Sequence, residues 1–247
     1  FTLENESGKD QWLVLETAKP FTNHVNLYQV DTRKTVCSGD AIPFELKSLP
    51  TNFSALPIFV PSGENREYVL QVKAEGENLS IPMVLSDRKE YMGSDANRKM
   101  FIGVFLGIFI FVSIIYFFFF VILKERLFLI YVLYASFSGL LQFALDGYMH
   151  EFVFTSGGYF TQHCVMIIAG ATVIFGMLYA FGYLALTGVM KKVGAVIIVM
   201  VIITMITSLI PQIRFEITFQ LINGFSMLGL IFMMVSGYLQ RKKRKVS

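Results

Sequence analysis

The chain has 247 residues, of which 54% are hydrophobic and only 16% are charged, and its formal net charge is +3. Typical soluble domains carry about 25% charged residues, and most charges here lie before residue 100. The small net charge gives no signal for nucleic-acid binding. Cys37 and Cys164 lie in the two different halves, so we expect no disulfide framework. The composition predicts two regions in different solvents, divided near residue 97.

Residues 1–88 have the pattern of a β domain. Apolar and polar residues alternate in five short runs, at 11–17, 25–30, 56–60, 68–73 and 80–85. Turn residues separate the runs, which is typical of an antiparallel sandwich of the jelly-roll kind. A complete jelly roll has about eight strands, so we expect that strands are missing at the front and that Phe1 marks a cut.

Residues 89–99 are expected to form a short linker, followed by membrane-spanning helices over 100–240. Crossing a bilayer takes about 20 apolar residues. Five runs qualify, at 100–123, 127–145, 161–186, 194–210 and 217–239. A basic tail, 241–247, completes the chain. The predicted fold class is therefore a membrane protein with an N-terminal β-sandwich and a helical bundle with five visible spans.

Basic residues in the short connections predict the orientation of the bundle, because cytoplasmic loops are enriched in Lys and Arg. The bases on one side are Lys124, Arg126, Lys191, Lys192 and the cluster Arg241–Lys245. Arg98, Lys99 and Arg214 fall on the other side, so the rule is not obeyed cleanly. The balance predicts an extracytoplasmic β domain and a cytoplasmic C-terminus.

Polar residues gather at the predicted outer ends of the spans, where buried polar groups are functional candidates. They are Gln142, Asp146, His150, Glu151, Gln162, His163 and Glu216. Of these, Gln142, Asp146, His150, His163 and Glu216 are candidate ligand contacts, against the alternative of solvated loops and helix caps. His150, His163 and Asp146 could together form a metal site, but their spacing in the sequence matches no local metal-binding motif, so we expect no metal and no cofactor.

Two pairs of residues are candidates for helix packing, one made of glycines and one made of polar residues. Gly103 and Gly107 lie four residues apart, which allows close approach of another helix. Gln220 and Asn223 lie three residues apart on one face, where an interhelical hydrogen bond is favoured over a ligand contact.

Three aromatic residues of the β domain, Trp12, Tyr28 and Phe44, are candidates for a platform on which a sugar ring stacks. The alternative is that they belong to the core of the sandwich.

The order of these elements resembles the bacterial seven-transmembrane receptors with diverse intracellular signalling modules. In the β half the resemblance is carried by Trp12-Leu13, Asn26-Leu27-Tyr28, Gly39-Asp40, Pro43-Phe44, Tyr68–Val72 and Ile81-Pro82-Met83. In the membrane half it is carried by Gly103 and Gly107, the turn Lys124-Glu125-Arg126, the run Phe128–Tyr134, and Gln142 leading to Gly147-Tyr148.

The resemblance implies an extracytoplasmic jelly-roll sensor in the inner membrane of a bacterium, which relays a signal through seven helices to a cytoplasmic output module. We expect two further spans and the output module beyond Leu239 in the full-length protein. The partners implied are membrane lipids, a carbohydrate or other small-molecule ligand, the output module and a possible second copy of the chain, with no nucleic acid.

No catalytic motif occurs in the sequence, so we expect no enzymatic activity from these residues. The alternative to a receptor is a scaffold or assembly protein, or a passive lipid-binding or transport protein with an accessory β domain. Ion-coupled transport is disfavoured because the central parts of all five predicted spans lack charged residues.

Overall fold

The computed structural model describes residues 1–17, 19–20, 22–73, 82–210 and 212–246, and the side chains of these except 162 and 242–246. The chain divides into two compact units. The first comprises Phe1–Gly103 with Phe143–Gln162, and the second comprises Val104–Gln142 with His163–Ser247.

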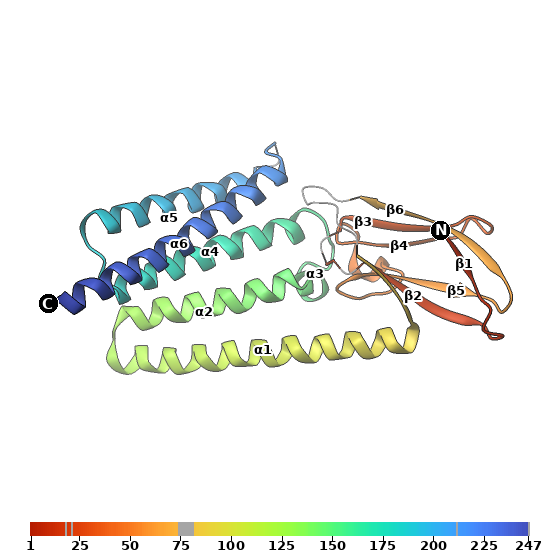
Figure 1. The fold of residues 1–247 in the computed structure, drawn as a ribbon, viewed down its shortest axis with the longest axis horizontal. Coiled ribbons are helices and arrows are strands. Elements are labelled where there is room, and N and C mark those ends of the chain that lie inside the picture. The colour runs from red at the N-terminus through yellow and green to blue at the C-terminus, as the bar shows by residue number, and fades with distance from the viewer. Residues whose placement is uncertain (18, 21, 74–81, 211, 247) are drawn as a thin grey trace. The chain divides into compact units, whose positions relative to one another are not determined.

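Two antiparallel sheets form the β domain of the first unit (Figure 1). One sheet has the order β1 (Thr2–Glu4), β6 (Asn65–Lys73), β3 (His24–Gln29) and β4 (Thr35–Ser38). The other has the order β5 (Ser54–Val60), β2 (Gln11–Thr17) and β7 (Met83–Asp87). The predicted β-sandwich is confirmed. Residues 80 and 81 of the last predicted run lie outside the described residues.

The sandwich core follows from the alternation of side chains along the strands. In β2, Leu13 and Leu15 face the other sheet, whereas Val14 and Glu16 face away from it. The buried core residues are Leu15, Val25, Leu27, Leu56, Ile58, Val60 and Tyr68. The outer face of β2 is also covered, because Val14 packs with Ala55 and with Tyr91 of the following helix.

Helix α1 (Arg88–Leu123) begins directly after β7, so that residues 89–99, expected to be a linker, are its first three turns. The Asp87 side chain accepts a hydrogen bond of 2.7 Å from the Lys89 backbone N–H. An aspartate in this position caps a helix by satisfying a backbone donor of the first turn. Hydropathy did not reveal this part of the helix because its residues are mostly polar; most of them are exposed, and Tyr91 and Asp95 are buried.

The remaining helices are α2 (Arg126–Leu145), the short α3 (Tyr148–Phe152), α4 (Tyr159–Tyr183), α5 (Gly188–Ser208) and α6 (Phe215–Val246). Among the described residues, five helices are long and apolar enough to cross a membrane: α1, α2, α4, α5 and α6. The predicted fold class, a sandwich followed by five apolar helices, is therefore confirmed.

In the second unit, α1 packs on α2 through close contacts between small and aromatic side chains. The hydroxyl groups of Ser113 and Ser136 lie 3.3 Å apart, and the rings of Tyr116 and Tyr131 lie 4.0 Å apart. Helices α4, α5 and α6 share two buried clusters. The first is Met166, Val201 and Ile222, and the second is Met177, Leu186 of the turn between α4 and α5, and Phe232, with Ile197 and Ile198 of α5 packed against it.

Candidate functional site

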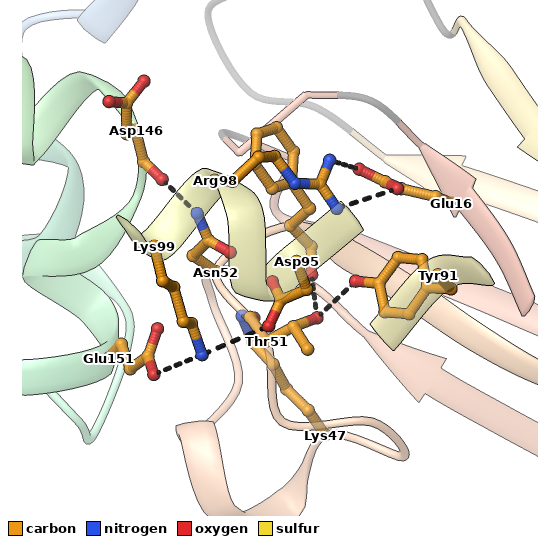
Figure 2. Close-up of polar contacts among 11 residues, drawn as sticks. Glu16, Lys47, Thr51, Asn52, Tyr91, Asp95, Arg98, Lys99, Asp146 and Glu151 are labelled. Carbon is orange, nitrogen blue, oxygen red and sulfur yellow. Dashed lines mark hydrogen bonds and ion pairs between the residues drawn. The ribbon is translucent and has the colours of Figure 1, made fainter. Parts of the chain in front are cut away.

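Three segments of the first unit meet in a polar junction (Figure 2). They are the β domain, the first three turns of α1, and residues 143–158, which connect α2 to α4 through α3. We call this contact the junction. It joins the β domain to the start of α1 and to the connection that follows α2.

Arg98 of α1 holds Glu16 of β2. Nη1 and Nη2 of Arg98 donate to Oε1 and Oε2 of Glu16 over 2.5 and 3.2 Å. Glu16 is 5% exposed, and the Arg98 guanidinium also lies over the ring of Phe53, 4.5 Å from its centre. Such a two-pronged pair fixes the orientation as well as the distance of its partners. It therefore sets the rotation of α1 relative to β2.

Tyr91 forms a second link, about two turns earlier on α1. Its side chain is 1% exposed, and its hydroxyl donates to Oγ1 of Thr51 over 3.1 Å. The Thr51 carbonyl accepts a bond of 3.1 Å from Nζ of Lys47. Burial lowers the pKa of Lys47 to about 8, against the charges of Asp40 and Glu151, which raise it. Lys47 is therefore a buried cation at neutral pH.

Lys99 connects α1 to α3. Its ammonium group lies 3.0 Å from Oε1 of Glu151 and 3.3 Å from Oδ2 of Asp95, one turn back on its own helix. Because Asp95 and Glu151 are both largely buried, the shared cation offsets two carboxylates that would otherwise repel each other. This cluster ties the start of α1 to the connection between α2 and α4.

Main-chain groups of the 143–158 connection also bind to the β domain. The Asn52 amide donates to the Asp146 carbonyl over 2.8 Å, and the Phe44 N–H donates to the Thr155 carbonyl over 2.8 Å. The Gly158 N–H donates to the Asp40 carbonyl over 3.1 Å. Backbone bonds of this kind hold the connection against the β domain independently of its side chains.

The connection needs glycine at 147 and 157. Both have positive φ angles, +81° and +71°, which side chains rarely adopt. A Cβ at Gly157 would lie 2.6 Å from the Ile42 carbonyl oxygen, and one at Gly147 would lie 2.9 Å from that of Asn52. The two segments of the chain thus approach more closely than a residue with a Cβ would allow.

His150 lies inside the junction, with 2% of its surface exposed and its ring edge-on to that of Phe44 at 5.7 Å. Burial, assisted by the charge of Lys47, lowers the pKa of His150 to about 4, although the backbone of Ile42 opposes the shift. The imidazole is therefore neutral at pH 7.

A groove of about 580 Å³ opens in the β domain, and its described lining residues differ from those named at the junction. Its lining residues are Trp12, Leu27, Gln29, Thr32, Lys34, Thr35, Val36, Ser48, Pro57, Ile58, Phe59, Arg66 and Tyr68. They come from both sheets and include the edge strands β4 and β5. The rings of Trp12 and Phe59 lie 4.5 Å apart at this groove. We call this cavity the inter-sheet groove.

The three predicted platform aromatics do not share one surface. Trp12 lines the inter-sheet groove, whereas the Tyr28 hydroxyl donates to Oε1 of Gln71 over 3.1 Å and Phe44 packs against His150. Neither Tyr28 nor Phe44 is among the described lining residues of the groove. A stacking role remains a prediction for these residues.

The structure brings together three of the polar candidates, Asp146, His150 and Glu151, at the junction. The others occupy the second unit, apart from Gln162, whose side chain is outside the described part. There the ring of His163 lies 5.2 Å from that of Phe215, and Glu216 forms an exposed ion pair of 2.7 Å with Arg214. Gln142 lies near the end of α2. Ligand contact stays a prediction for these residues, and no group of three metal-binding side chains occurs among the described residues.

The helix-packing candidates lie on open parts of their helices. A Cβ at Gly103 or Gly107 would meet nothing within 4 Å. Asn223 donates to the Phe219 carbonyl of its own helix over 3.0 Å, and Gln220 is exposed. Their role in packing against another helix stays a prediction.

Sequence reasoning missed the residues that form the junction, above all Glu16, Tyr91 and Arg98. One signal was present: Arg98 and Lys99 violated the charge bias of the connections. The structure explains the exception, because carboxylates of the first unit pair with both cations.

A β domain followed by five helices long and apolar enough to cross a membrane defines a multi-pass membrane protein with an attached β domain. Comparison with protein families agrees. The model described as "7TMR-DISM extracellular 2" matches residues 1–87, and the model described as "7TM diverse intracellular signalling" matches residues 98–247. The chain belongs to the 7TMR-DISM family of membrane receptors, with an extracellular domain and a 7TM region. Comparisons with curated proteins and with solved structures found no match.

Proposed function

We propose that this chain senses a small molecule with its β domain and relays the signal through its helices to a cytoplasmic output module on the C-terminal side of α6. The ligand occupies the inter-sheet groove, and the junction transmits the change. A ligand shifts a conformational equilibrium only if it binds the two states with different affinity. The groove is suited to such a difference in affinity, since its lining residues come from both sheets. A change in the distance between the two sheets would therefore change the binding site.

The observation that carries the proposal is the junction itself. Arg98 and Tyr91 attach α1 to the β domain, while Asp146, Thr155 and Gly158 attach the connection between α2 and α4. Displacement of the β domain therefore acts on two membrane segments. A flexible linker would absorb such a displacement, whereas α1 continues as one helix from Arg88 to Leu123.

Fusion of a reporter output after Ser247 tests the relay. Lys99→Met removes the cation between Asp95 and Glu151, and we expect it to change the basal output or abolish the response to ligand. Lys89→Met is the matched control, since Lys89 is exposed on the same helix, and it should leave the output unchanged. Deletion of residues 1–86 should also abolish the response. An unchanged response in Lys99→Met and in the deletion would contradict the proposal.

We also propose that the protein lies in the inner membrane of a bacterium, with the β domain outside and the C-terminus in the cytoplasm. The support is the concentration of Lys124, Arg126, Lys191, Lys192 and the tail on one side. Arg98 and Lys99 weigh little against it because both are paired. Alkaline phosphatase fused after Ser247 should be inactive, because this enzyme matures only outside the cytoplasm. The same fusion after Tyr159 should be active, and the reverse result would reject the orientation.

A further inference from the structure

The lining of the inter-sheet groove includes two neighbouring aromatic residues, Trp12 and Phe59. Their rings lie 4.5 Å apart and are tilted by 39°, yet Trp12 remains 52% exposed and Phe59 remains 38% exposed. These two residues are opposite each other on β2 and β5. Aromatic faces left open beside a cavity provide a large apolar contact for a flat or apolar ligand.

The polar part of the groove is cationic. Its ionisable lining residues other than Tyr68 are Lys34 and Arg66, and none of the described lining residues is Asp or Glu. Arg66 uses Nε and Nη2 to bind one oxygen of Glu64, which is 50% exposed. A guanidinium has five N–H donors, so further donors of Arg66 can bind a ligand.

The other lining residues are mixed in character. Leu27, Val36 and Ile58 are apolar, while Gln29, Thr35 and Ser48 supply hydrogen-bonding groups. Ligand sites in proteins are mostly apolar with a few placed polar groups that fix orientation. The groove has this composition, together with a net positive charge from its lining side chains.

We propose that the inter-sheet groove binds an organic carboxylate with an aromatic or otherwise apolar body, which deepens the proposed receptor function by naming the class of ligand. Arg66 and Lys34 bind the carboxylate, and Trp12 and Phe59 contact the apolar body. A charge-assisted hydrogen bond contributes more than a neutral one, so the charge of the ligand decides its affinity. Neutral sugars, which stack on aromatic rings without a charge, lack this contribution.

Trp12 makes the test direct, because it is the 1 tryptophan of the chain. The whole chain is placed in phosphatidylcholine nanodiscs, and its tryptophan fluorescence is titrated with 4-phenylbutyrate, 4-phenylbutanamide and 4-phenylbutylamine. These probes share one body and differ in charge. We expect saturable binding of the carboxylate, with affinity at least about tenfold higher than that of the amide, and no saturable binding of the amine.

Variants locate the binding within the groove. Arg66→Gln and Lys34→Gln should each weaken carboxylate binding by about tenfold and leave amide binding unchanged. Lys9→Gln is the matched control, an exposed charge outside the groove lining, and should have no effect. If Arg66→Gln fails to fold, Lys34→Gln and the loss of affinity in added salt give the same readout.

Equal affinity for carboxylate and amide, tighter binding of a neutral sugar, or no saturable change with the carboxylate would overturn the assignment. These outcomes are separate from those of the receptor proposal, since binding is measured without a reporter. Charge-dependent binding in a chain whose reporter never responds would retain the ligand class and reject the receptor function.

Discussion

Arg98 and Glu16, 82 residues apart in the sequence, form a two-pronged ion pair that joins the start of α1 to β2. The Glu16 side chain is 7% exposed and that of Arg98 is 29% exposed. Because the carboxylate is buried, the pair differs from an exposed salt bridge, which contributes little. Loss of Arg98 leaves the buried Glu16 carboxylate without this cation, and loss of Glu16 leaves a partly buried guanidinium without this carboxylate.

The ion pair should show strong coupling in a double-mutant cycle. We expect Arg98→Gln and Glu16→Gln each to lower the free energy of unfolding of the first unit by about 2–4 kcal/mol. The double variant should recover part of this loss, with a coupling energy of about 1–3 kcal/mol. Denaturant unfolding in nanodiscs measures it, with the fluorescence of Trp12, on the same strand as Glu16, as the signal.

The matched control for this cycle is the pair Arg214 and Glu216, whose side chains are 73% and 46% exposed. Its coupling should be below about 1 kcal/mol. Coupling energies of equal size in the two cycles would show that the Arg98 pair has no special role.

Gly157→Ala should open the contact between the connection and the β domain. The added methyl group would collide with the Ile42 carbonyl oxygen. The alanine would also have a positive φ angle, which costs about 1–2 kcal/mol for an L-residue. Gly158→Ala has the same φ strain but nothing within 4 Å of its Cβ. Faster amide hydrogen exchange of residues 146–158 in Gly157→Ala than in Gly158→Ala is the expected result. Equal exchange would mean that the steric contact is unimportant.

His150 should make the junction sensitive to acid. Its pKa is lowered from 6.5 to about 4 in the folded chain, so the unfolded chain binds more protons between these values. The free energy of unfolding therefore falls as pH falls from 6.5 to 4, by about 3 kcal/mol in all, and levels off below. Thermal unfolding of the first unit across this range measures the loss.

His150→Gln is the comparison for that titration, because the glutamine side chain neither gains nor loses a proton in this pH range. The variant should lose the component of the pH dependence that lies between 6.5 and 4. A pH profile identical to that of the unmodified chain would rule out His150 as its source.

Tyr91→Phe should isolate one hydrogen bond of the junction. The substitution keeps the ring against Val14 and Ala55 but leaves the Thr51 hydroxyl without this donor. Because the site is buried, the expected loss of unfolding free energy is about 1–2 kcal/mol. Tyr28→Phe removes an exposed bond to Gln71 and should be close to neutral. The two variants are compared by denaturant unfolding, and equal losses would contradict the prediction.

The sequence by itself determined the two halves, the five apolar helices and the inward face of β6. The alternation in the run 68–73 places Tyr68, Leu70 and Val72 on one face, and all three pack in the sandwich core. Such features can be predicted from local periodicity and hydropathy, because the polarity of the residues in a segment indicates whether that segment faces water, lipid or the protein core. The short strands β1 and β4 were missed, since 3 and 4 residues are too few to show a period.

Only the tertiary structure decided which residues form the junction and the groove. Glu16 meets Arg98 across 82 residues, and Trp12 meets Phe59 through the pairing of β2 with β5. Contacts of this kind depend on strand order and on where α1 begins, neither of which has a local signature. The polar first turns of α1 therefore resembled a linker in the sequence. Their partners, buried carboxylates and backbone groups far away in the chain, become visible only once the fold brings them together.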